Sequence, residues 1–462
     1  MRATVVACVL LAWRPAASAQ PASAPTAAPA DDLDQRLRAL EEDNRRLRQE
    51  MDSLKESQEQ TRQQAARATG RVSGYVDVGF FAVQGNGSGL RADLGYRYFP
   101  RYAGLVPDSW VFYGDPLATA INSRGEPADT SQSRAVTFDP VHNGGAPSFI
   151  VNALNLSLFA SPAESVVVQG LVDLVPRGRD VSNPSGIALG DFIDVKLAYV
   201  EYLTGTDWML LSVYAGKLDP VLGIEYRSQE SPDRIGVTPS LICRYTCGRP
   251  VGLKARARFL DEALTVLLAV TNGSHVTEMF PFYGEIDQNS FKTVAGRVSY
   301  LLPFANLEIG ASGLVGAQDN QPSNQPLHKH LGFDLHLDVS GLELSAEFVK
   351  GTIGEIDKAP PAAGVPVCND APCLDYKGAY GLLGYRVTNW LMPYARVDWR
   401  SAEHRSGASF VYVTDILRAT GGLHLELGTH SILKAEYTLN RELGALPQFP
   451  DDVFTSSLVV KF

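Results

Sequence analysis

The residues best suited to chemistry are charged side chains at every second position of several segments. Lys254, Arg256 and Arg258 form the densest ladder of one sign, and Asp334 and Asp338 form an acidic counterpart. Successive side chains of a β-strand point to opposite faces of the sheet, so each ladder lies on one face. A ladder of cations lowers the electrostatic barrier for phosphate, carboxylate or sulfate. The alternative is a generally polar face whose cations are balanced by the acidic residues.

Apolar side chains fill the positions that alternate with these charges. Because placing a charged side chain against lipid costs free energy, the charged face is predicted to line a water-filled lumen. Opposed basic and acidic walls would then create a transverse field that favours polar solutes. The predicted channel-lining residues are Lys196, Lys217, Lys254, Arg256, Arg258, Arg297, Glu308, Asp334, Asp338, Glu343, Glu347, Arg396, Arg400 and Arg418.

The elements that carry the charges are predicted to be about sixteen β-strands, because the apolar period from Gly70 onward is two residues. Two of them, 207–219 and 264–273, are apolar on both faces, so their orientation stays open. The predicted strands are 71–84, 148–160, 165–176, 193–204, 207–219, 251–260, 264–273, 293–302, 305–317, 330–340, 342–351, 376–388, 390–402, 412–427, 430–442 and 452–462.

The connections between these strands alternate in length. Those after even-numbered strands are tight turns, such as Ser161–Glu164 and Asp261–Ala263, whereas most of the others are long. A transmembrane barrel sorts its connections in this way, and a soluble β-sandwich has no reason to do so. We therefore predict an all-β, antiparallel transmembrane β-barrel over residues 70–462. The longest connection, Gly85–Pro147, is predicted to enter the lumen, cap the barrel or cover an oligomer contact.

The amino-terminal part has a different organisation. Residues 1–19 combine Arg2, an apolar stretch and small residues before Gln20, which predicts a secretory signal peptide. Residues 20–30 form a linker rich in Pro and Ala. Residues 31–66 carry a heptad repeat, which predicts an α-helical coiled coil ahead of the barrel.

The heptad also predicts an oligomer. Its core positions are Leu33, Leu37, Leu40, Asn44, Leu47, Met51 and Leu54. The flanking g and e positions have opposite signs in every pair, which favours parallel helices in register. We expect a homo-oligomer, with three chains favoured over two. The alternative is a single solvated helix stabilised by its own ion pairs.

The remaining composition excludes several other functions. The net charge of −10 argues against a nucleic-acid partner. Cys243, Cys247, Cys368 and Cys373 lie in two close pairs, for which we favour disulfides 243–247 and 368–373 over a zinc site, since no histidine flanks them. We find no nucleophile paired with a base, so neither an enzyme nor a cofactor is expected.

Three motifs resemble outer-membrane porins. They are Gly74–Asp77 at the start of the first strand, Tyr199–Tyr202 before a turn, and Ala215–Glu225, which ends a strand before a loop. The most similar groups are the OmpL-like putative β-barrel porins and the phosphate-selective porins. The resemblance to porins also extends to the last strand, which ends on the aromatic Phe462.

The resemblance implies a passive, trimeric diffusion channel for small hydrophilic solutes in the outer membrane, with the coiled coil in the periplasm. It also implies that Phe462 is a signal read by the barrel assembly machinery and that outer-membrane lipid surrounds the barrel. Phosphate selectivity is not carried over, because the loops lack dense clusters of arginine and lysine. The alternative is a structural barrel that connects envelope layers through its coiled coil.

Overall fold

The computed structural model describes residues 70–84, 90–93, 99, 111–115, 147–174, 193–274, 287–302, 306–317, 324, 327–354, 373–406, 410–444, 446, 448 and 450–462. The chain divides into two units, Met1–Ala65 and Ala66–Phe462, and the described residues belong to the second. The predicted signal peptide, linker and coiled coil, with the heptad positions from Leu33 to Leu54, lie outside them.

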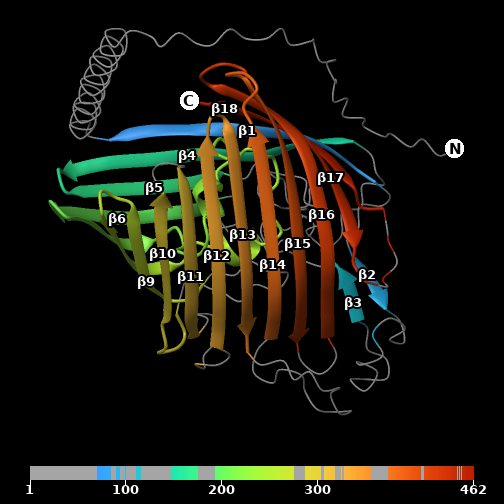
Figure 1. Ribbon diagram of the computed structural model, residues 1–462, viewed down its shortest axis with the longest axis horizontal. Coiled ribbons are helices and arrows are strands. Elements are labelled where there is room, and N and C mark those ends of the chain that lie inside the picture. Colours follow the sequence, from blue (N-terminus) through green and yellow to red (C-terminus); the bar gives the residue numbers. More distant parts are fainter. Residues whose placement is uncertain are drawn as a thin grey trace, which may run out of the picture. The chain divides into compact units, whose positions relative to one another are not determined.

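The second unit is a closed antiparallel β-barrel of 16 strands (Figure 1). Neighbours along the barrel pair in chain order, and β1 closes the ring by pairing with both β4 and β18. The barrel strands are β1 (Arg71–Val83), β4 (Ser148–Ala163), β5 (Val166–Leu174), β6 (Ile193–Thr206), β7 (Met209–Lys217), β8 (Val251–Phe259), β9 (Leu264–Thr271), β10 (Thr293–Leu302), β11 (Leu307–Ala317), β12 (Leu327–Val339), β13 (Leu342–Ile353), β14 (Cys373–Tyr385), β15 (Leu391–Ser406), β16 (Phe410–Glu426), β17 (Ser431–Glu442) and β18 (Val453–Lys461).

The predicted barrel and the order of its strands are therefore confirmed, and one connection differs from the prediction. The turns after even-numbered barrel strands are short, and we call that side the short-turn end and the opposite side the long-loop end. Only residues 407–409 separate β15 from β16, because both strands extend further than expected. The first part of β16, at Val411–Val413, pairs in parallel with β3 (Val111–Gly114), which in turn pairs with β2 (Leu90–Asp93).

The burial of individual side chains shows which face of the two strands 207–219 and 264–273 points into the barrel. In β7, Tyr214 is buried inside the barrel, whereas Val213 is exposed. In β9, Leu267 is buried inside, whereas Leu268 and Val270 are exposed on the outer surface. Many outward positions of the other strands are likewise apolar and exposed, as expected for a wall that faces hydrocarbon.

The barrel closes at a tight seam near the short-turn end. The backbones of Gly74 and Phe462 exchange two hydrogen bonds of 3.0 and 2.9 Å. A Cβ atom at position 74 would lie 2.1 Å from the carbonyl oxygen of Asn155 and 2.8 Å from the Phe462 ring. The glycine is therefore required sterically where β1 pairs with both its neighbours.

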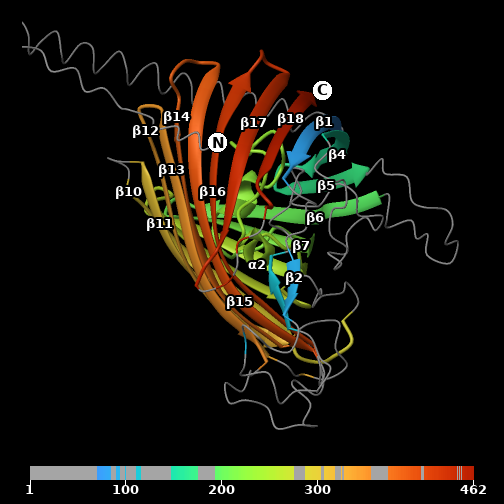
Figure 2. The same cartoon turned by 90° about the vertical axis from the view of Figure 1, so that its right-hand side faces the viewer.

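Helical structure is sparse among the described residues. It comprises the 3₁₀ turn η6 (Glu225–Ser228) and the single turn α2 (Cys243–Thr246), both in the connection between β7 and β8. In the described part of the chain, no helix has the length and apolarity needed to cross a membrane. Figure 2 shows α2 within the ring of strands rather than beyond its rim.

Candidate functional site: an inward-folded loop and a charged cavity

Residues 218–250, which we call the lumen loop, fold into the barrel. Their apolar side chains explain why, since Val221 and Leu222 pack in one buried cluster with Leu267 of β9 and Leu314 of β11. A connection that projected into solvent would leave this surface exposed to water. The first part of the lumen loop is thus held against the wall formed by β9–β11.

The second part of the lumen loop packs against a different part of the wall, β13–β15. Ile242 and Tyr245 belong to a buried cluster with residues of β13 and β14, and the Tyr245 ring stacks on Tyr376 with centroids 3.8 Å apart. Cys243 and Cys247 form a disulfide that closes α2. Because both sulfurs are bonded to each other, they are not available as thiolate ligands for zinc.

Two carboxylates of the wall accept hydrogen bonds from the backbone of the lumen loop. Glu347 of β13 accepts from the amides of Ile224 and Glu225 at 2.8 and 2.5 Å. Glu436 of β17 accepts from the amides of Val237 and Thr238 at 2.8 and 3.0 Å. These bonds satisfy loop amides that would otherwise be buried without partners.

Cations of the wall bind the carbonyl groups of the same loop. Lys434 of β17 donates to three loop carbonyls, at distances that include 2.8 and 3.1 Å. Arg396 of β15 donates to the carbonyl oxygen of Thr238 at 2.6 Å, and Arg400 donates to the Tyr245 hydroxyl at 2.7 Å. The lumen loop is therefore fixed from several sides of the barrel.

The first long connection contributes one described group to this interior. Asp115, which follows β3, is fully buried and forms ion pairs with Arg244 of the lumen loop and Arg400 of β15, both at 3.1 Å. The segment 85–147 therefore does enter the barrel at this residue. The sequence did not single out residues 218–250 as the loop that crosses the lumen.

A cavity of about 380 Å³ lies between the lumen loop and the wall of β6–β11. Its lining includes the basic ladder, and the ladder residues differ in their partners. Lys254 donates to the carbonyl oxygen of Asp219 at 2.9 Å, and Arg256 lies 3.4 Å from Glu201. Arg258 pairs with Glu262 in the short turn that follows β8.

Glu308 faces the ladder across this cavity. It accepts two hydrogen bonds from Arg227 of the lumen loop, at 2.7 and 3.0 Å, and one from Arg297 at 2.8 Å. The charged lining of the cavity is Asp219, Arg227, Lys254, Arg256, Arg258, Glu262 and Glu308. Glu308 is thus paired with two arginines at short distances. Lys254 and Arg256 instead contact a backbone carbonyl and a carboxylate at 3.4 Å.

The other predicted channel-lining residues lie elsewhere in the interior. Arg297 and Asp334 form a buried pair at 2.5 Å, and Asp338 lies opposite Glu343 near the short turns. Lys196 of β6 forms ion pairs with Asp173 of β5 and with Glu230 of the lumen loop. Lys217 is half-buried at the end of β7.

Glu347, Arg396, Arg400 and Arg418 are all buried, and the first three contact the lumen loop. Arg418 instead donates to the side chain of Asn440 on β17 at 3.1 Å. The inward-facing charged residues therefore have two roles. Some line the cavity, and others form hydrogen bonds that hold the lumen loop. A run of apolar residues and a cysteine pair within 218–250 was the signal that this loop packs inside.

The ionisable groups of the lumen loop are tuned by burial and by their neighbours. Burial raises the pKa of Glu225, although Ser240 donates hydrogen bonds that oppose the shift. Burial also acts to raise the pKa of Glu230, but Lys196 and Arg249 outweigh it and lower that pKa below its usual value. Glu230 is therefore an anion at neutral pH, held between two cations.

The second cysteine pair is described only in part. Cys373 is disulfide-bonded at the start of β14, and Cys368 lies outside the described residues. The pairing 368–373 stays a prediction.

Fold and site define the class of protein: a closed 16-strand antiparallel β-barrel with a loop held inside it. No protein-family model and no curated protein sequence matches the chain.

Solved structures with a similar arrangement include OmpF of Salmonella typhi in complex with daunomycin (10% identity, TM-score 0.48), which covers 85% of this chain and 97% of its own. The trimer form of OmpT from Vibrio cholerae has 11% identity and a TM-score of 0.46, with 85% and 99% covered. An anion-selective porin from Comamonas acidovorans has 11% identity and a TM-score of 0.43, with 85% and 98% covered.

Proposed function

We propose that the protein is a passive, water-filled channel of the outer membrane for small hydrophilic solutes and ions. The observation that carries the proposal is the charged cavity inside a closed barrel whose outer surface is apolar. Such a wall is stable in hydrocarbon, and a charged interior is stable only in contact with water. The lumen loop narrows the path and leaves the cavity beside β8.

Anions are preferred in this channel. Lys254 and Arg256 line the cavity, and their contacts are a backbone carbonyl and a carboxylate at 3.4 Å rather than close ion pairs. Each cation at about 7 Å in water stabilises an anion by about 0.6 kcal/mol and destabilises a cation equally, which changes the preference for anions over cations by about sevenfold. The ladder therefore favours anions even though acidic residues share the cavity.

The channel is a homo-oligomer, with a trimer favoured. The heptad of residues 31–66 supports this proposal, because its core positions and opposite g and e charges suit parallel helices. We assign the coiled coil of residues 31–66 to the periplasm and the barrel to the outer membrane. Residues 1–19 direct the export that this location requires.

Conductance in a planar bilayer tests the function. The purified full chain is expected to give discrete conductance steps, and a salt gradient is expected to give a reversal potential displaced toward chloride. Arg256→Ala should reduce the preference for chloride over its cation by about sevenfold. Lys350→Ala is the matched control, since Lys350 is exposed on the outward side of β13 and should leave ion preference unchanged.

A second function, a structural barrel without conductance, is favoured by the tight support of the lumen loop. Arg297, Arg400, Arg418 and Lys434 are among the largest fully buried side chains of the described residues, so much of the interior is filled. A barrel of this kind would connect envelope layers through the coiled coil. Absence of conductance steps from correctly folded protein would refute the channel and leave this function in its place.

A further inference from the structure

The outward face of β13–β16 changes abruptly from apolar to charged near the long-loop end. Strand register places Phe348, Ala379, Trp399 and Leu417 in one row across the four strands. The next row toward the long loops is Lys350, Lys377, Ser401 and Asp415. In a membrane-spanning barrel such a change marks the boundary between the hydrocarbon and the lipid headgroups.

Two lysines lie directly opposite each other at this boundary. Lys350 of β13 is the register partner of Lys377 of β14, and both are exposed. Like charges directly opposite across a strand pair are destabilising. Among the described residues neither lysine forms an ion pair, and the Lys377 ammonium lies 5.4 Å from the centroid of the Trp399 ring. An anion between the two ammonium groups would remove the repulsion.

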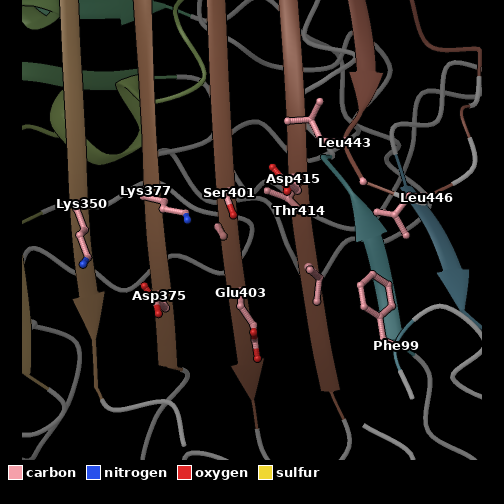
Figure 3. Close-up of a pocket in the computed structure, with 13 residues that line it drawn as sticks. Phe99, Lys350, Asp375, Lys377, Ser401, Glu403, Thr414, Asp415, Leu443 and Leu446 are labelled. Carbon is pink, nitrogen blue, oxygen red and sulfur yellow. The ribbon is translucent and has the colours of Figure 1, made fainter. Parts of the chain in front are cut away.

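A groove of about 530 Å³ borders these lysines on the outer surface (Figure 3). Lys350, Lys377 and Ser401 come from three neighbouring strands, and Asp375 and Glu403 lie nearer to the strand ends. On the far side the groove is apolar, with Phe99, Leu443 and Leu446. The site thus combines two lysines, three carboxylates (those of Asp375, Glu403 and Asp415) and an apolar surface.

We propose that this groove binds the phosphate-bearing headgroup of a membrane lipid. The phosphate lies between Lys350 and Lys377, which donate charge-assisted hydrogen bonds to it. Asp375 and Glu403 keep the phosphate on the lysine side by repulsion. The acyl chains of the same molecule run along the adjacent apolar row, over Trp399. Tryptophan is enriched at membrane interfaces.

The apolar row is what favours a lipid over free phosphate. Phe348 and Leu417 are 37% and 36% exposed, so hydrocarbon chains attached to the phosphate gain contact with them. A free phosphate gains only the two lysines. The site lies on the opposite side of the wall from the charged cavity, so it is independent of conduction.

Native mass spectrometry of the full chain in neutral detergent tests the proposal. The probes are dioctanoyl phosphatidic acid, dioctanoyl phosphatidylcholine and inorganic phosphate. Phosphatidic acid should bind more tightly than the other two. Lys350→Gln should weaken it about fivefold and the double variant with Lys377→Gln about 30-fold, with phosphatidylcholine unchanged. Asp375→Asn should strengthen the binding of phosphatidic acid.

A charge-matched control separates a site from a general surface effect. Arg386→Gln with Lys461→Gln removes the same charge near the short-turn end and should leave phosphatidic acid binding unchanged. Equal weakening by this control, or no preference over phosphatidylcholine, overturns the proposal. Inorganic phosphate binding as tightly as phosphatidic acid overturns the choice of a lipid. Conductance of the Lys350/Lys377 variant should match that of the unmodified chain, which keeps this test separate from that of the channel.

Discussion

The support of the lumen loop gives a quantitative prediction at Glu436. Its carboxylate accepts from the amides of Val237 and Thr238, from the Thr238 hydroxyl at 2.5 Å and from the Tyr394 hydroxyl at 2.7 Å. All of these groups are buried inside the barrel. Glu436→Gln keeps the size of the side chain and replaces one acceptor oxygen with a donor NH₂ group.

The substitution is expected to weaken the closed position of the loop by about 3 kcal/mol. One buried amide loses its acceptor, which costs about 1–3 kcal/mol, and the remaining bonds lose the contribution of the negative charge. A change of 3 kcal/mol in local opening raises the rate of amide exchange about 150-fold. The effect should be confined to the lumen loop, since the strand ladders keep their hydrogen bonds.

Hydrogen–deuterium exchange of the full chain in detergent measures this change. Peptides that contain Val237 and Thr238 should exchange faster, and peptides from β12–β14 should not. Glu426→Gln is the control, because Glu426 forms an exposed pair with Arg386 and does not contact the loop. A change of less than about threefold in the Glu436→Gln protein would show that Glu436 does not hold the loop.

Two further predictions concern the seam and the loop. Gly74→Ala should destabilise the barrel by about 1–3 kcal/mol, because its Cβ atom would lie 2.1 Å from a carbonyl oxygen of β4. Urea unfolding measures it, with Gly421→Ala as a control that has nothing within 4 Å, and equal stability of the two variants would contradict it. Glu230→Gln should weaken loop closure by about 1–3 kcal/mol at pH 7, because Lys196 and Arg249 each lose one of their two carboxylates and keep the other, Asp173 or Asp219. The folded pKa of Glu230 is lowered, so its contribution is full above the usual value of 4.5 and declines as the pH falls below it. Exchange of the loop amides measured from pH 7 to pH 3 should show the variant and the parent converging, and a constant difference would refute the assignment.

The barrel was predictable because a strand wall repeats one local rule. Each side chain faces either lipid or the interior, so apolar and polar residues alternate along the strand, as Phe333 and Asp334 do. Turn chemistry is equally local, as at Ser340 and Gly341, whose φ angles of 50° and 81° suit a two-residue hairpin turn. Strand ends were less predictable, since the start of β16 pairs with β3, which is distant in sequence.

The division of the inward charges was not predictable from alternation. Arg256 and Arg396 have the same strand period and the same charge, yet one lines the cavity and the other is buried under the lumen loop. What distinguishes them is where residues 218–250 pack. That position depends on contacts such as Tyr245 with Tyr376, which join residues far apart in the chain.

The position of the loop also explains why the cavity is asymmetric. Glu347, Arg396, Lys434 and Glu436 all come from β13–β17, and their charges are matched by loop backbone or by one another. On that side the loop covers these four side chains, which are all buried. The ladder of β8 lies where the loop leaves room, so Lys254 and Arg256 retain contact with the cavity. In the proposed channel, ion preference would be set less by the total charge of the interior than by which charges the loop covers.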